Sequence, residues 1–146
     1  MKNANGWLRL VKMYNVVIDT NILVSGLISP RGHPAQIINA LKMRRFNLFY
    51  DAEIMAEYED VLKREKFGFN PHDVNELLDV ITEIGMPVLI EKSTFHFDDE
   101  DDRAFYDVAV ASGSYVITGN INDFPNEPFI IRPKDFMDKL NNLHTN

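Results

Sequence analysis

The sequence predicts an α/β protein, a three-layer α/β/α domain built on a mostly parallel sheet. The first observation is the run Val16-Val17-Ile18, three β-branched residues that suit a strand buried on both faces. The second is the alternation of short apolar runs with longer helical patterns along the chain, which is typical of a parallel sheet. We expect Val16–Ile18 to form the central strand.

Length and composition agree with one globular domain. The chain has 146 residues, 45% of them hydrophobic, which is enough to bury a core. It has no cysteine, which excludes disulfides and thiolate metal sites. We expect a single domain over residues 13–146, with Met13 a second plausible start and residues 1–12 an appendage. No secretory signal or membrane span is visible, so we expect a cytoplasmic protein.

The net charge of −7 narrows the functional classes. A general nucleic-acid coat is usually basic, so this charge argues against one. It does not exclude an enzyme that acts on nucleic acid, because clustered acids in an active site contribute to the negative charge. If such acids hold divalent cations, the sign of the local field changes.

The first half of the chain predicts helices and one more strand after the central strand. Pro34 suits the first position of the second helix, and Asp51 is a good N-cap for the third. The predicted elements are, in order, a helix with Ile22, Leu23, Val24 and Leu27 on one face, a helix with Ile37, Ile38 and Leu41 that ends at Lys42, Arg44 and Arg45, a strand over 47–50, and a helix over 52–63 with Ile54, Tyr58, Val61 and Leu62.

The second half predicts the remaining strands and helices. Asn70 and Pro71 open a strongly amphipathic helix that Gly85 closes. An acidic run over 98–102 leads into a helix that ends at Ser112 and Gly113. The other predicted elements are strands over 87–90, 115–118 and 129–131 and a last helix that begins at Pro133, carries Phe136 and Leu140, and is frayed from Asn141 onward.

Acidic and amide side chains stand at four places in this pattern. They are Asp19, Glu57, the group Asp99, Asp101 and Asp102, and the segment Thr118-Gly119-Asn120 with Asp123. Each has an ordinary structural explanation. Asp19 is a possible helix cap, Glu57 shares a polar face with Glu53 and Asp60, aspartates favour a helix N-terminus, and the last group suits a turn.

Taken together, these side chains indicate a site. The ends of parallel strands meet at one edge of the sheet, so Asp19 and Thr118 can be neighbours, and the helix that begins near Asp102 starts at the same edge. Two carboxylates about 4 Å apart repel by about 4 kcal/mol at an effective dielectric constant of about 20. A shared proton or cation relieves this repulsion, and oxygen ligands without His or Cys suit Mg²⁺ or Mn²⁺.

The same stretches resemble the motifs of PIN-domain ribonucleases. The matching segments are Val17-Ile18-Asp19-Thr20-Asn21, Glu57 to Leu62, Asp99 to Phe105, and Val116-Ile117-Thr118-Gly119-Asn120. They occur in the family's order over about residues 14–138. As a set, these segments are specific for the family, although any one of them alone is a weak signal. The branch that the chain resembles most is the toxin component of bacterial toxin–antitoxin pairs.

The resemblance implies a Rossmann-like sheet of strand order 3-2-1-4-5 and a Mg²⁺- or Mn²⁺-dependent endoribonuclease activity. By motif position, Asp19, Glu57 and Asp102 correspond to the acidic metal-site residues, and Thr20, Asn21 and Thr118 support them. The family often has Thr-Gly-Asp where this chain has Thr118-Gly119-Asn120. We expect Asn120 to support the site without charge, and Asp123 to serve as a replacement metal ligand.

The resemblance also implies partners. The substrate is single-stranded RNA, a small antitoxin protein is the expected partner of a toxin-like branch, and we expect a homodimer. Cations that could contact RNA phosphates are Arg31, Lys42, Arg44, Arg45, Lys63, Arg64 and Arg103. Ordinary surface solubility is the better explanation for most of these cations.

Other α/β classes lack their necessary residues here. A haloacid-dehalogenase-like phosphatase needs a second acid two residues after the first, where this chain has Asn21. A receiver domain needs an aspartate after the third strand, where this chain has Glu91-Lys92. A dinucleotide-binding enzyme needs a glycine-rich turn after the first strand. The remaining alternative is a catalytically weak PIN-fold module that binds RNA or an antitoxin.

Overall fold

A computed structural model describes residues 13–94 and 96–143 of the chain. The predicted appendage, residues 1–12, lies outside the described residues. Within them, five strands form one parallel sheet in the order β3-β2-β1-β4-β5. The strands are β1 (Asn15–Ile18), β2 (Asn47–Tyr50), β3 (Met86–Pro87), β4 (Tyr115–Ile117) and β5 (Ile130–Ile131). The predicted α/β class, strand order and central strand are confirmed.

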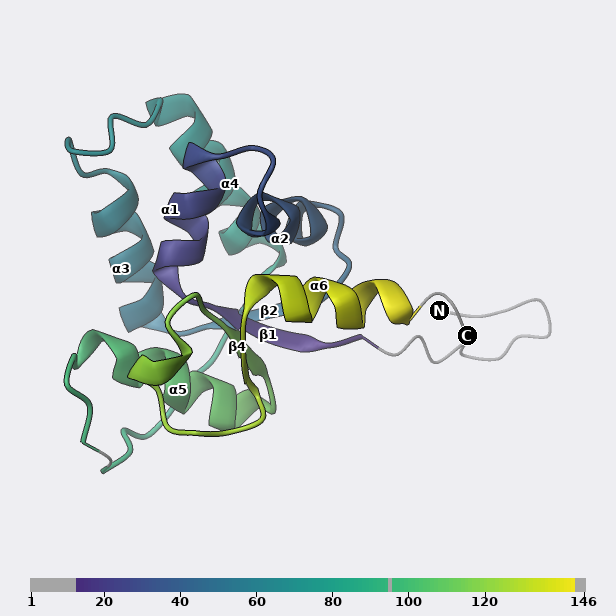
Figure 1. Cartoon of the computed structure of the whole chain (residues 1–146). Coiled ribbons are helices and arrows are strands. Elements are labelled where there is room, and N and C mark those ends of the chain that lie inside the picture. The colour runs from purple at the N-terminus through teal and green to yellow at the C-terminus, as the bar shows by residue number, and fades with distance from the viewer. Residues whose placement is uncertain (1–12, 95, 144–146) are drawn as a thin grey trace, which may run out of the picture.

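Helices cover both faces of this sheet (Figure 1). They are α1 (Thr20–Ile28), α2 (His33–Lys42), α3 (Ala52–Leu62), α4 (Pro71–Ile84), α5 (Asp101–Ser112) and α6 (Pro133–Asn142), with a short 3₁₀ helix, η1 (Ile121–Asp123). Helix α5 packs against β1, β2 and β4 on one face, whereas α2 and α6 contact each other on the other face. Helix α3 lies beside α1 and also contacts α5, so it reaches the edge where the strands end, here called the carboxyl edge.

Local sequence signals account for most of the helix starts. The carboxylate of Asp51 accepts a hydrogen bond from the backbone N–H of Ile54 at 2.8 Å, and Asn70 accepts one from His72 at 2.8 Å. Both predicted N-caps are therefore confirmed. Among the described residues, no helix combines the length and the apolar character that crossing a membrane requires.

Several element boundaries differ from the sequence-based expectation. The third strand is Met86–Pro87 rather than 87–90, because chain pairing stops after Val88 donates to the carbonyl of Tyr50 and the next side chain, Leu89, is fully exposed. The second helix begins at His33, with Pro34 inside its first turn. The fourth strand ends at Ile117 rather than at Thr118. The last helix continues through Asn142, so fraying from Asn141 is not observed.

An aromatic cluster packs α6 onto the strand starts, here called the amino edge. The ring of Phe136 is fully buried and lies 5.7 Å from the ring centre of Tyr14, 5.6 Å from that of Phe46 and 6.2 Å from that of Tyr115. Such edge-to-face contacts add to the energy of burial. Buried polar side chains lie instead at the carboxyl edge, where Asp19, Asp51 and Thr118 follow β1, β2 and β4.

Candidate active site

Asp19 directly follows β1 and occupies the N-cap position of α1. Its carboxylate makes no hydrogen bond of full capping geometry to the described backbone of the first turn, although the backbone N–H groups of Asn21 and Thr20 lie close enough to lower its pKa. Its strongest side-chain contact is with β4: Oδ2 of Asp19 accepts a hydrogen bond from Oγ1 of Thr118 at 2.7 Å. Asp19 is only 5% exposed. The carboxylate is thus held by a tertiary contact at the carboxyl edge.

The hydroxyl group of Thr118 is itself held in place. Thr118 is fully buried, and its Oγ1 accepts a hydrogen bond from the backbone N–H of Asn120 at 3.0 Å. Because this N–H occupies an acceptor position of the hydroxyl, the hydroxyl proton is directed toward Asp19. The segment Thr118-Gly119-Asn120 therefore positions Asp19 through its backbone as well as its side chains.

Glu57 lies in the middle of α3 and faces the start of α1. Its Oε2 accepts a hydrogen bond from Oγ1 of Thr20 at 2.5 Å. The next residue, Tyr58, is fully buried and donates its hydroxyl proton to the carbonyl oxygen of Ile18 at 2.5 Å. Glu57 is half-buried, whereas Glu53 and Asp60 on the same helix are exposed. Glu57 therefore does not belong to the solvated helix face to which the sequence alone could assign it.

Asp102 lies in the first turn of α5 and is half-buried. Its pKa is raised from 3.8 to about 7, first by burial and then by the negative charges of Asp19, Asp99, Asp123 and Glu57. The shift means that the ionised form of Asp102 is disfavoured in the folded protein. Near neutral pH, the protonated and ionised forms of Asp102 are therefore both populated.

The other two predicted catalytic carboxylates show the same coupling. Burial raises the pKa of Asp19, and the Thr118 hydrogen bond offsets part of that rise. Burial also raises the pKa of Glu57, and the charges of Asp101 and Asp19 raise it further. We use the name acidic cluster for the three carboxylates with raised pKa values and the three whose charges act on them: Asp19, Glu57, Asp102, Asp99, Asp101 and Asp123.

The ion pairs of the described residues do not include any carboxylate of the acidic cluster. Repulsion of this kind raises the affinity for protons or for a cation. The donor set contains only oxygen, which suits Mg²⁺ or Mn²⁺.

Spacing limits how such an ion can be held. Among the described residues, no group of three His, Asp or Glu side chains is spaced to hold an ion directly. Mg²⁺ sheds its water reluctantly and commonly binds through one or two carboxylates and several water molecules. The residues therefore fit a hydrated ion rather than one enclosed by three side chains.

The predicted supporting residues divide into two groups. Thr20 and Thr118 are buried and hold members of the acidic cluster. The side chains of Asn21, Asn120 and Asp123 are exposed. Asp123 lies in η1 and still contributes to the raised pKa of both Asp19 and Asp102, so its charge reaches the site. Its role as a replacement metal ligand stays a prediction.

The cations predicted to contact RNA are dispersed over the molecule. Arg44 and Arg45 lie between α2 and β2, at the amino edge, and Arg45 donates to Asn141 at 3.2 Å. Arg103 pairs with Glu100 at 2.8 Å and donates to the carbonyl of Ser93 at 2.7 Å, which ties the preceding loop to α5. The pairs Lys42–Glu76 and Arg64–Asp60 are surface ion pairs, while Arg31 and Lys63 are exposed.

The sequence pattern does not assign a role in the site to three groups of residues at this edge. It places Tyr58 only in an apolar stripe, yet the Tyr58 hydroxyl holds the end of β1 beside Asp19. It groups Asp99 and Asp101 with Asp102 in one motif without making them site residues, yet the charges of both raise the pKa of Glu57. Arg132 is exposed and directly follows β5, at the carboxyl edge. Its place in the sequence, a basic residue directly after a predicted strand, is the signal that could have pointed to it.

Comparison with known proteins agrees with this geometry. Residues 15–122 match the model of a family described as PIN domain. The chain therefore belongs to the PIN domain family, whose members are generally nucleases. It is also 28% identical over 132 residues to uncharacterized protein MJ1680 of Methanocaldococcus jannaschii, a match that covers 88% of this chain and 82% of that protein.

The raised pKa of Asp102 predicts how stability depends on pH. Between about pH 4 and pH 7, the folded protein retains a proton on Asp102 that the unfolded chain has released, so we expect the free energy of unfolding in EDTA to fall as the pH rises. Asp102→Asn should reduce this slope. Urea unfolding from pH 4 to pH 8 measures it, with Asp79→Asn, an exposed position in α4, as the control. Equal slopes in the two variants would contradict the coupling.

Proposed function

We propose that this protein is an endoribonuclease that hydrolyses phosphodiester bonds of single-stranded RNA with Mg²⁺ or Mn²⁺, and that it is the toxin of a toxin–antitoxin pair. The observation that carries the proposal is the acidic cluster, six carboxylates at the carboxyl edge that form no ion pair among the described residues and three of which have raised pKa values. Family membership supports nuclease chemistry in general. Family membership alone does not specify the metal, the RNA substrate or the toxin role, and these three are what we propose.

The chain's own residues prepare this edge for the reaction. Asp19, Glu57 and Asp102 would hold a hydrated ion, in part through its water molecules. Such an ion, when bound, lowers the pKa of a water molecule and stabilises charge on the phosphate. Thr118 and the N–H of Asn120 orient Asp19, and Thr20 orients Glu57. Asp102, whose pKa is about 7, releases its proton when a cation is held beside it.

Cleavage of single-stranded RNA tests the proposal. Purified protein is incubated with a labelled RNA in Mg²⁺, in Mn²⁺ and in EDTA, beside an Asp19→Asn preparation. The expected result is cleavage with either metal, loss of cleavage in EDTA and loss in the variant. Cleavage that persists in EDTA, or that is equal in the variant, would show a contaminating nuclease or a different mechanism.

A second candidate function rests on a specific observation. Asn120 replaces a carboxylate, and no three described side chains are spaced to hold an ion directly. A catalytically weak module that binds RNA or an antitoxin fits a site of this reduced charge. Tight RNA binding without cleavage in Mg²⁺ or Mn²⁺ would favour it. Sedimentation across a concentration range separately tests the proposed homodimer, which a monomer at high concentration would exclude.

Metal affinity tests the parts played by Asn120 and Asp123. The charge of Asp123 reaches Asp19 and Asp102, so we expect Asp123→Asn to weaken Mn²⁺ binding. Asn120→Asp adds one negative charge at the same edge, and we expect it to tighten binding, since affinity depends on ligand charge. Calorimetric titration with Mn²⁺ measures both, with Asp79→Asn as a charge-matched control. Unchanged affinity in both variants would place neither residue in the metal site.

A further inference from the structure

The connection between β4 and β5 forms a small pocket beside the acidic cluster. The pocket has a volume of about 240 Å³, and its lining residues all lie between positions 121 and 130. Asp123, a member of the acidic cluster, lies within the same stretch, between the lining residues Asn122 and Phe124. Asn126, on the far side of the pocket, is three residues from Asp123, which limits the distance between their Cα atoms to about 11 Å. The pocket is therefore next to the place where an RNA phosphate would be cleaved.

The surrounding fold holds this pocket in shape. Phe124 is only 6% exposed and anchors the middle of the connection in the hydrophobic core. Its backbone N–H donates to the carbonyl of Ile121 at 3.3 Å, and the N–H of Thr118 donates to the carbonyl of Ile131 at 3.0 Å, which ties the far end of the connection to the sheet. A pocket fixed in this way is largely formed before a ligand arrives.

The lining combines apolar walls with hydrogen-bonding side chains. The walls are supplied by Ile121, Phe124, Pro125 and Ile130. Asn122, Asn126 and Glu127 add two amides and a carboxylate. Within residues 13–94 and 96–143, none of these three side chains makes a hydrogen bond or an ion pair with another residue. Their donors and acceptors are therefore available to a ligand that is itself partly apolar.

The charge of the pocket distinguishes between the parts of an RNA strand. Glu127 in the pocket and Asp123 beside it are both acidic, which disfavours a phosphate group and favours a neutral base. A carboxylate only accepts hydrogen bonds, and guanine is the base whose Watson–Crick edge presents two adjacent N–H donors. The amides of Asn122 and Asn126 can donate to the carbonyl oxygen of the same edge. Guanine is therefore the base that these side chains fit best.

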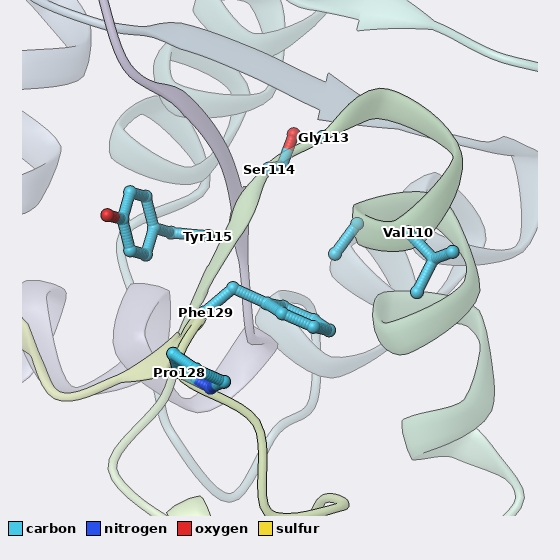
Figure 2. Close-up of a pocket in the computed structure, with 7 residues that line it drawn as sticks. Val110, Gly113, Ser114, Tyr115, Pro128 and Phe129 are labelled. Carbon is cyan, nitrogen blue, oxygen red and sulfur yellow. The ribbon is translucent and has the colours of Figure 1, made fainter.

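A larger groove of the molecule does not fit this base. That groove has a volume of about 470 Å³ and lies at the amino edge, where α5 ends and β4 begins. Figure 2 shows the ring of Phe129 directed across it toward Val110, with Pro128 beside Phe129. Its lining residues, all of them in the described part of the chain, include no amide or carboxylate side chain. A base bound there would also lie across the sheet from the acidic cluster.

We propose that the pocket between β4 and β5, named here the base pocket, binds a guanine base of the RNA strand that is cleaved at the acidic cluster. Glu127 accepts hydrogen bonds from the two N–H groups of the base, and Asn122 or Asn126 donates to its carbonyl oxygen. The base pocket rests on the proposed function for RNA as the ligand and adds to it a preference for one base. Glu127 is a specificity-determining residue, whereas the acidic cluster performs the cleavage.

Titration with nucleotides tests the base pocket without a cleavage step. The monophosphates GMP, AMP, CMP and UMP carry the same phosphate group, so a difference between them comes from the base. In EDTA, GMP should shift the NMR signals of the Asn122 and Asn126 side-chain amides and bind at least about tenfold more tightly than AMP, the discrimination expected of one bidentate pair. Glu127→Gln should remove this difference. Glu65→Gln, at an exposed position between α3 and α4, should retain it. Equal binding of the four nucleotides, or equal effects of the two variants, would overturn the proposal.

Mapping of the cut positions separates the base pocket from the proposed function. In a labelled RNA that contains a single guanosine, cleavage with Mn²⁺ should fall mainly at one fixed position relative to that guanosine, and Glu127→Gln should spread the cuts along the strand. Cuts spread evenly by the unaltered protein would overturn the base pocket and leave the ribonuclease activity standing. If no RNA is cut with either metal, the proposed activity fails, and the GMP titration, which needs neither metal nor cleavage, still decides whether the pocket binds guanine.

Discussion

Asp19→Asn is expected to lower RNA cleavage by at least about 10²-fold, the loss that follows removal of one group from a charge-stabilising site. The same change should raise thermal stability at pH 8, because it removes a carboxylate whose ionisation is disfavoured by burial. The amide oxygen can still accept the Thr118 hydrogen bond, so the fold at the end of β1 is retained. Cleavage rates and thermal unfolding of the same preparation measure the two opposite effects.

Asp107→Asn is the matched control for this prediction. Asp107 is also a buried aspartate, 6% exposed, and its Oδ2 accepts a hydrogen bond from the backbone N–H of Ser93 at 2.9 Å. It is not among the charges that raise the pKa of Asp19, Glu57 or Asp102, so its cleavage rate should stay near that of the unaltered protein. A comparable loss of cleavage in both variants would mean that Asp19 acts only through folding.

Phe136→Ala is expected to lower the free energy of unfolding by about 3–5 kcal/mol, the usual cost of removing a large buried aromatic ring. Phe136 is fully buried and contacts the rings of Tyr14, Phe46 and Tyr115, so the change leaves a cavity between α6 and the sheet. A loss of this size is a large fraction of the 5–15 kcal/mol typical of a domain. Urea unfolding followed by circular dichroism measures it.

Met43→Ala is the comparison for this core prediction. Met43 is an apolar residue with 71% exposure, and changes at such surface positions usually stay within about 0.5 kcal/mol. If Phe136→Ala cost no more than Met43→Ala, α6 would not be a part of the cooperative core.

The sequence alone was sufficient for the architecture because the signals for it are local. The β-branched run Val16–Ile18 specifies a strand buried on both faces, and the caps at Asp51 and Asn70 act on backbone groups two or three residues away. The alternation of strands and helices requires a parallel sheet. The resemblance to the PIN family, confirmed by the match over residues 15–122, provided the strand order and the expected site residues.

The end of the edge strand β3 depends on hydrogen-bond pairing with the neighbouring strand, which cannot be seen in the sequence. The strand expected over 87–90 ends at Pro87, because a strand continues only while a neighbour offers hydrogen-bond partners, and β2 ends at Tyr50. The apolar side chains of Leu89 and Ile90 therefore suggested a longer strand than the structure has. The sequence likewise does not show which edge of the sheet a basic residue occupies, since Arg45 and Arg132 look alike in sequence but lie at opposite edges.

The tertiary structure determined the hydrogen-bond partner, the burial and the pKa of each carboxylate in the site. By sequence, Asp19 is equally suited to cap α1, but the hydrogen bond that lowers its pKa most comes from Thr118, 99 residues away. Glu57 belongs by sequence to a polar helix face, but packing of α3 against α1 half-buries it beside Thr20. The pKa of Asp102 rises to about 7 because burial and four other carboxylates act on it. Residue type and spacing therefore determined which acids could form the site, whereas burial and charge proximity, which depend on how distant segments pack, determined which of them are coupled.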